Sequence, residues 1–387
     1  MASQKFTLPK VLAILALVLA AGWAVVSISR METPVHPEAP KPASQPVTNV
    51  GPTLPTSAKP PDFHPSKLEV MRNAINATTN AAAAARQSLA QWRKDLEAMP
   101  KAEAVNEIKR LLDSKQDAAT HLGFKLASNG WLDEAPTLRT FLLDELARID
   151  PAAAADYAKV ILAGMDSPDE WAVALRNLAS GDPSSDGQAL LQQKALAMLQ
   201  YEPWQENPSV GYLEAFDVAV YVGGTNLLPT LSSLVQKQDN PAIAHASYLA
   251  LDRLVINSPT TMLTALESDP GLMQGREATR ADYFARADVR DPQQRQVLES
   301  YLLNPSLSAR ELQTFAGIYP NANYMISANL LTQANTPNHD SLVNRDAQSL
   351  AVEQQWMIDP RFSNLQPVLQ KMTARLQGFV QQENQGR

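Results

Sequence analysis

The chain has 387 residues, a formal net charge of −7 and no cysteine. The acidic balance argues against a general nucleic-acid binder, which presents a basic face to phosphates. The lack of cysteine excludes disulfides, thiolate zinc sites and cysteine nucleophiles. Glycine is sparse, at 15 residues, and alanine is frequent, so the composition favours helices.

Residues 11–29, "VLAILALVLAAGWAVVSIS", carry no charge and come to nearly 30 Å of helix at about 1.5 Å per residue. They predict a transmembrane signal-anchor helix. Lys5 and Lys10 precede it, so the positive-inside rule places residues 1–10 in the cytoplasm and the rest outside it. This pattern suits a single-pass protein of a bacterial inner membrane with a periplasmic domain. The alternative is a cleaved signal peptide ending near Ala21, but the apolar run continues beyond that point.

Residues 30–65 form a proline-rich segment, with ten prolines between Pro34 and Pro65. Proline lacks the N–H that a hydrogen-bond ladder requires, and such a segment tends to a semi-extended conformation. We expect a disordered linker that holds the next domain away from the membrane. The alternative is a ligand for a proline-recognition domain.

Residues 66–387 are predicted to form an all-helical domain, because helical periodicity alternates with short breaks. Most breaks pair a capping residue with proline, a combination typical of helix starts. Further helices are expected at 223–226 and 319–323, and the mean spacing of about 21 residues fits helical hairpins. The eleven pairs begin at Asp150, Ser167, Asp182, Asn207, Asn240, Ser258, Asp269, Asp291, Asn304, Thr336 and Asp359.

Residues 227–254, "LLPTLSSLVQKQDNPAIAHASYLALDRL", resemble a HEAT-type repeat, with Ile243 at the valine position of its second helix and Ala250-Leu251 closing the pattern. Ala244 departs from the arginine that the family often has. The resemblance implies an α-solenoid of HEAT-like hairpins, and residues 135–162 follow the same rhythm. Residues 66–98 predict a long helix that caps the array. An irregular helical bundle, with TPR-like packing as a variant, is the other fold considered.

Motifs for chemistry are mostly absent. The histidines at 36, 64, 121, 245 and 339 form no helical ligand pair, and no serine-hydrolase elbow or phosphate-binding glycine loop is present. Residues 182–193 match part of a calcium loop, but Gln193 replaces the bidentate glutamate, so a polar turn fits better. His339 beside Asp340 is interpreted as the start of a helix near Ser341.

Two further patterns have a functional and a structural interpretation. Residues 276–295 hold five arginines and invite an anion site, but the interspersed acids predict i,i+4 pairs, Asp282–Arg286 and Asp291–Arg295, on a solvent face. The tryptophans are either the lining of a sugar cleft or anchors of the core, and the core is favoured. Outside residues 11–29, they are Trp92, Trp131, Trp171, Trp204 and Trp356.

The sequence therefore favours a membrane-anchored scaffold that binds a protein on its repeat surface and is not an enzyme. It nominates no catalytic, cofactor-binding or metal-binding residue and predicts no cofactor. A structural component of an envelope assembly is one alternative. Another is a helical-toroid enzyme acting on a polysaccharide, for which Glu134, Asp217 and Glu353 would have to meet in a cleft.

Overall fold

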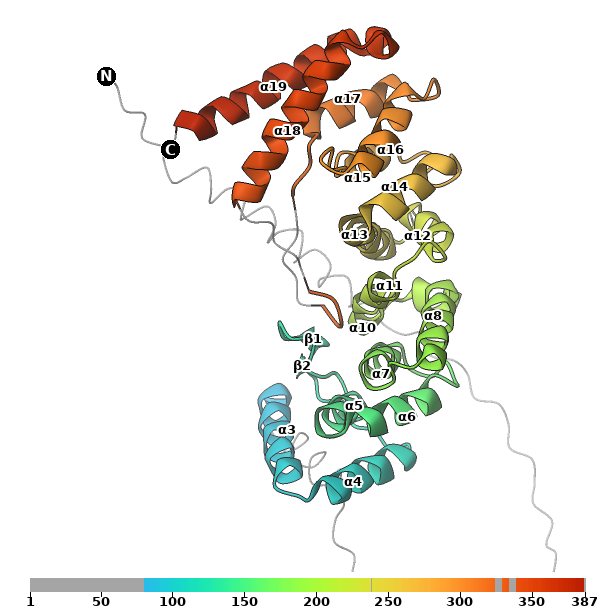
Figure 1. Ribbon diagram of the computed structural model, residues 1–387. Helices are drawn as coiled ribbons and strands as arrows, with labels where there is room; N and C mark the ends of the chain where they lie inside the picture. Colours follow the sequence, from blue (N-terminus) through green and yellow to red (C-terminus); the bar gives the residue numbers. More distant parts are fainter. Residues whose placement is uncertain (1–79, 238, 324–328, 334–338, 386–387) are drawn as a thin grey trace, which may run out of the picture. The chain divides into compact units, whose positions relative to one another are not determined.

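The computed structural model describes residues 80–237, 239–323, 329–333 and 339–385. This part of the chain is mostly helical, and its helices pack in chain order around one continuous cluster of buried apolar side chains (Figure 1). The elements are α3 (Ala81–Glu97), α4 (Lys101–Asp113), β1 (Lys125–Leu126), β2 (Leu132–Glu134), α5 (Leu138–Ile149), α6 (Pro151–Ile161), α7 (Pro168–Gly181), α8 (Ser185–Gln200), α9 (Glu202–Glu206), α10 (Val210–Glu214), α11 (Phe216–Val222), α12 (Leu228–Val235), α13 (Pro241–Asn257), α14 (Pro259–Ser268), α15 (Glu277–Phe284), α16 (Pro292–Leu303), α17 (Ala309–Ile318), α18 (His339–Ile358), the 3-10 helix η1 (Pro360–Leu365) and α19 (Gln366–Gln385).

Several helices begin where a capping residue precedes proline, as predicted. The side chain of Asp150 accepts from Ala153 N at the start of α6, and the side chain of Asn240 accepts from Ile243 N at the start of α13. Helices α7, α14 and α16 and the 3-10 helix η1 also begin at the proline of such a pair. A capping side chain accepts a hydrogen bond from a backbone N–H that has no partner within the helix. Proline has no backbone N–H, so at the first helical position it leaves no donor unpaired.

Four predicted helix starts are wrong. Helices α8, α10 and α17 begin two to four residues after the proline, each capped by a serine, Ser184, Ser209 or Ser308. At Asp269 the carboxylate accepts from Gly271 N within a turn, and α15 begins only at Glu277. Pro270 and Pro305 lie in turns, for which the φ of proline is equally suited. The pair at Thr336 lies outside the described residues.

The break at 223–226 does precede a new helix, α12, as expected, whereas residues 319–323 begin no helix. Helices α12 and α13, which carry the HEAT-like pattern, pack against each other, and so do α5 and α6. The long helix predicted over 66–98 is described only from Ala81, as α3. Helix α18 begins at His339, two residues earlier than predicted.

A small sheet corrects the prediction of an all-helical domain. Strands β1 and β2 pair antiparallel, with Lys125 opposite Glu134 and Leu126 opposite Leu132. Gly130 has a φ of +80° in the turn between them, a conformation that glycine adopts without the steric cost of a side chain.

The predicted signal-anchor at 11–29 and the proline-rich linker at 30–65 lie outside the described residues. Within the residues described, no helix is long and apolar enough to cross a membrane.

Candidate functional site: the connector-binding face

The described parts of the segment between α17 and α18 contact elements far from them in sequence. We call these two parts, residues 319–323 and 329–333, the connector. Figure 1 shows it leaving the α17 end of the array and reaching the neighbourhood of α11 and the β1–β2 hairpin. We call the surface that receives it the connector-binding face. Its contacts come from the β1–β2 turn, α11 and the α15 region, at Gly130, Asp217, Asp282, Ala285 and Arg286.

The first contact is at Asn321, next to α15. Its backbone N–H donates to Ala285 O at 2.7 Å, and its Nδ2 donates to Asp282 Oδ1 at 2.6 Å. The second oxygen of Asp282 accepts from the Tyr248 hydroxyl at 2.8 Å. Asp282 is therefore a bridge between α13 and the connector.

Arg286 makes the second contact. Its Nε and Nη2 donate to the two oxygens of Asp252, at 2.5 and 2.9 Å, while Nη1 donates to the backbone oxygen of Asn323 at 2.6 Å. Burial raises the pKa of Asp252, and Arg286 opposes that effect. From α18, Arg345 donates to Asn321 O and to Arg286 O. The two arginines thus hold the first part of the connector by its backbone.

Asp217, on α11, makes the third contact and is 4% exposed. Its Oδ2 accepts from the backbone N–H groups of Leu331 and Thr332, at 2.7 and 3.0 Å. Its Oδ1 accepts from the Thr332 hydroxyl at 2.5 Å and pairs with Arg253 Nη2 at 2.6 Å. One carboxylate therefore binds a stretch of chain 114 positions away and keeps a cationic partner on α13.

The connector finally reaches the turn between the two strands. A Cβ on Gly130 would lie 2.5 Å from the backbone oxygen of Leu330 and 3.1 Å from that of Asn329. Real Cβ atoms do not approach an oxygen that closely. Glycine is required here twice, for the positive φ of the turn and for the close approach of the connector backbone.

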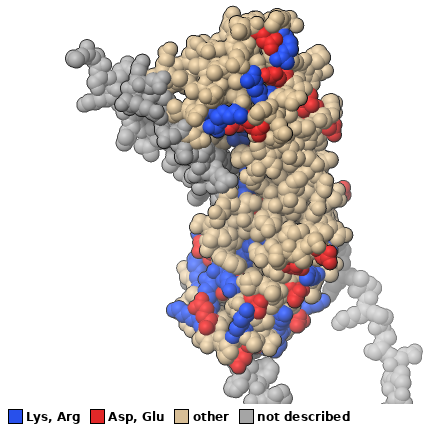
Figure 2. Space-filling model, in the orientation of Figure 1, with Lys and Arg blue, Asp and Glu red and all other residues tan. Residues whose placement is uncertain are grey.

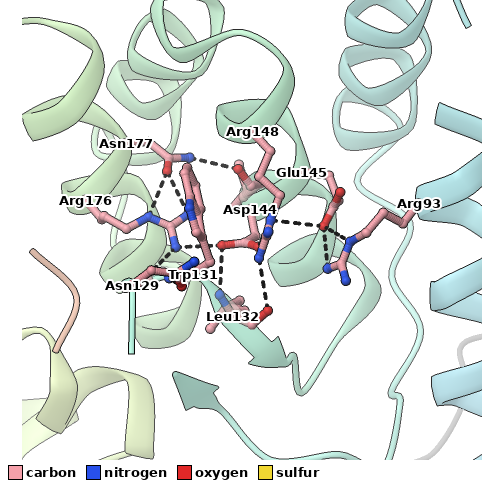
Figure 3. Close-up of polar contacts among 11 residues, drawn as sticks. Arg93, Asn129, Trp131, Leu132, Asp144, Glu145, Arg148, Arg176 and Asn177 are labelled. Atoms are coloured by element: carbon pink, nitrogen blue, oxygen red, sulfur yellow. Dashed lines mark hydrogen bonds and ion pairs between the residues drawn. The ribbon is translucent and has the colours of Figure 1, made fainter. Parts of the chain in front are cut away.

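A buried polar cluster supports this turn (Figure 3). Arg176, on α7, donates from Nη1 to Gly130 O at 3.0 Å and to Asp144 Oδ1 at 2.6 Å. The other side of its guanidinium donates to Asn177 Oδ1, and Asn177 Nδ2 donates to Leu143 O. Asp144 is fully buried and also accepts from the backbone N–H of Leu132. The cluster ties α5, α7 and the hairpin together.

Trp131 lies between two arginines of the same cluster. The Cζ atoms of Arg148 and Arg176 are 4.8 and 4.6 Å from its ring centroid, within the range of cation–π contacts. Arg148 also donates to Asp144 Oδ2 at 2.9 Å and to Leu132 O at 3.2 Å. This tryptophan orients the two arginines.

At the edge of the cluster, Glu145 accepts from Nε and Nη2 of Arg93, at 2.8 and 2.6 Å, which ties α3 to α5. Burial raises the pKa of Glu145, and the hydrogen bond from Arg93 opposes that effect. Burial lowers the pKa of Arg176, and Asp144 opposes it. Each of these two buried groups has an oppositely charged side chain beside it, which offsets the free-energy cost of removing the group from water.

The three carboxylates considered for a polysaccharide enzyme do not contact one another. Glu134 pairs with Arg86 at the end of β2, and Asp217 holds the connector. Glu353, on α18, is fully buried, and among the described residues neither of its oxygens has a hydrogen-bond partner. Burial raises its pKa to about 8. Each of the three therefore has its own surroundings, and no hydrogen bond or ion pair joins them among the described residues.

Other sequence motifs are also placed by the structure. Residues 185–193 belong to α8, so the calcium-loop pattern coincides with a capped helix, and Asp182 pairs with Lys159 at 3.0 Å. In the part of the chain that is described, no group of three or more His, Cys, Asp or Glu side chains is placed to hold a metal ion. Trp92, Trp171, Trp204 and Trp356 are buried in the core, as favoured.

The predicted pairs in the arginine-rich segment are wrong. Arg286 pairs with Asp252 rather than Asp282, and Arg295 pairs with Glu299 rather than Asp291. Asp291 instead caps α16. Asp282 accepts a hydrogen bond from the connector, and Asp291 accepts hydrogen bonds at the start of α16. These contacts replace the ion pairs that local spacing predicts.

Charged side chains are unevenly distributed on the face in Figure 2. They gather over α3 to α5 and again over the elements from α15 to η1, while the surface over α11 to α13 is mostly uncharged. In the second group, Arg290 pairs with Asp288 and Arg361 with Asp359. Positive charges in this group lie beside negative ones.

Comparisons with protein-family models, curated proteins and solved structures gave no match. Sequence reasoning missed most of the connector-binding face. The Asn129-Gly130 dipeptide is a turn signal that would have pointed to the hairpin. Nothing local marks Thr332 or Arg253, because their roles depend on contacts between distant parts of the chain.

Proposed function

We propose that this protein is a membrane-anchored scaffold that binds another protein through the connector-binding face. Asp217, Arg286 and Arg345 direct their polar groups at the backbone of a non-helical segment. Backbone groups are common to all polypeptides, so a surface that binds them has the chemistry needed to hold a partner segment. This observation carries the proposal.

The HEAT-like pattern at 227–254 supports the same function, since stacked helical hairpins offer extended binding surfaces. The uncharged run at 11–29 and the linker at 30–65 support an anchor and spacer that hold the domain on the extracytoplasmic side, in a bacterial periplasm. The scaffold requires no catalytic residue or cofactor.

The test is cross-linking in native membranes with the full chain, followed by mass spectrometry that maps the linked residues. We compare the wild type with Asp217→Ala combined with Asp282→Ala. The matched control is Asp133→Ala, an exposed carboxylate whose ion pair with Lys125 lies on the surface. We expect a partner linked next to α11 and α15, at least about 10-fold less abundant in the double variant and unchanged in the control.

Equal recovery of the partner in all three proteins would show that the connector-binding face is not the binding surface. Links only between copies of this chain would favour the structural assembly instead.

A further inference from the structure

The Asp217 carboxylate accepts hydrogen bonds from a particular set of groups, which restricts the peptide sequences that fit. The carboxylate takes two successive backbone N–H groups and the hydroxyl of the second residue. Two positions before that hydroxyl, Leu330 is 2% exposed and packs in the core. Leu331, between them, is partly buried and packs against the same core. The preferred sequence is therefore two apolar residues and then threonine or serine.

We infer that Leu330-Leu331-Thr332 occupies, within its own chain, the site for a partner peptide of the form apolar–apolar–threonine or serine. The inference rests on the proposed function and deepens it. The connector is then a built-in competitor that a partner segment replaces.

The electrostatics of the site permit such an exchange. Besides the connector, Asp217 pairs with Arg253 at 2.6 Å. When the connector leaves, the carboxylate keeps an opposite charge, and no unpaired buried charge remains, which is otherwise the main cost of opening such a contact. The incoming peptide restores the same three hydrogen bonds.

A segment attached to its own site competes at a high effective concentration, on the order of millimolar for a short flexible attachment. A free peptide therefore binds the wild-type chain only weakly, and it binds more tightly when the internal contact is weakened. Thr332→Val does this, because it removes the hydroxyl that donates to Asp217 and keeps the side-chain shape.

The experiment uses the full chain and a fluorescent peptide with the sequence of residues 319–333, followed by anisotropy. We compare wild type, Thr332→Val, Thr332→Ser and the control Thr264→Val, an exposed threonine on α14. We expect Thr332→Val to bind the peptide at least about 10-fold more tightly than the wild type, the scale of one lost hydrogen bond to a charged group. Thr332→Ser and Thr264→Val should bind as the wild type does.

The peptide itself gives a second readout that does not depend on the folding of a variant chain. A peptide carrying the Thr332→Val change should compete at least about 10-fold less well for the wild-type chain at high concentration. Asp217→Asn in the chain should remove the difference between the two peptides.

Equal binding by wild type and Thr332→Val, equal competition by the two peptides, or no binding up to about 1 mM would overturn the inference and make the connector a fixed tie. Because the cross-linking test follows a natural partner, a partner captured there together with failure here would mean that it binds the scaffold without replacing the connector.

Discussion

At the scale of single residues, buried carboxylates differ by whether they have a partner. Asp144 accepts from Arg176, Arg148 and a backbone N–H. Glu353 is equally buried, near Thr373 and Arg375 of α19 and Tyr319 of the connector. Burial raises the pKa of Glu353 to about 8, so Glu353 is expected to keep its proton in the folded chain. Two predictions follow from this contrast.

We predict that Glu353 makes the folded state less stable as the pH rises. Its pKa is about 8 in the folded chain, against 4.5 as the ordinary value. Between these two values the unfolded chain has lost a proton that the folded chain still holds, so stability is full below pH 4.5 and declines up to pH 8. Glu353→Gln should reduce this slope, to which other carboxyls with raised pKa values, such as Glu145 and Asp252, also contribute. It should be more stable than the wild type at pH 8 by about 2 kcal/mol or more, at about 1.4 kcal/mol per pKa unit.

The measurement is urea denaturation of both proteins across this pH range. The control is Glu97→Gln, an exposed carboxyl at the end of α3, which should leave the slope as it is. If the stability of Glu353→Gln depends on pH as steeply as that of the wild type, the Glu353 carboxyl is not the group that keeps its proton in the folded chain.

We predict that Asp144→Asn destabilises the fold by about 3 kcal/mol or more, because it leaves the buried guanidinium of Arg176 without its charge partner. The matched control is Asp133→Asn, in the same region. Its ion pair with Lys125 is exposed, with side chains 52% and 62% accessible, so its loss should cost less than about 1 kcal/mol. Denaturant midpoints of the two variants compare the effects directly, and similar midpoints would contradict the prediction.

At the scale of elements, the helices approach one another most closely where a glycine permits it. A Cβ on Gly181, the last residue of α7, would lie 2.0 Å from Pro151 O and 2.9 Å from the Ala155 side chain on α6. By contrast, a Cβ on Gly378 in α19 would meet nothing within 4 Å. The same substitution should therefore have opposite effects at the two positions.

Gly181→Ala should cost about 1–3 kcal/mol by forcing α6 and α7 apart. Gly378→Ala should stabilise the protein by about 0.5–1 kcal/mol, because alanine is the better helix former and has room there. Thermal unfolding of both variants decides the matter. A stabilised Gly181→Ala protein would mean that α6 and α7 adjust to the extra methyl group without cost.

How far the sequence predicts these elements depends on how local the determinant is. Asn240 and Ser167 cap helices through an N–H three residues away, so their pattern is visible in the sequence. Asp182 has the same pattern, yet it bonds to Ser184 and the helix begins later, because two local hydrogen-bonding options compete. The sequence marks Asp217 and Glu353 as ionisable candidates, but it does not show their surroundings. Asp217 binds the connector, which is distant in sequence, and Glu353 is fully buried.

At the scale of the whole array, the connector changes how helices depend on one another. The helices contact mainly their near neighbours in the chain, so they are expected to open locally rather than as a whole. The connector adds contacts between α17, α15, α11 and the hairpin that skip the intervening helices. It should therefore couple the opening of distant units.

We predict that the double variant Asn321→Ala with Thr332→Val uncouples them. In the wild type, hydrogen exchange of α5–α7 and of α15–α17 should report similar opening free energies. Asn321 and Thr332 each donate one side-chain hydrogen bond to a carboxylate of the array. Losing both should separate the two regions by about 1–2 kcal/mol, since each such bond contributes on the order of 1 kcal/mol or more. The control Thr264→Val, which leaves the connector intact, should show no separation. If the two regions open together in the double variant as well, contacts between neighbouring helices, and not the connector, carry the cooperativity of the fold.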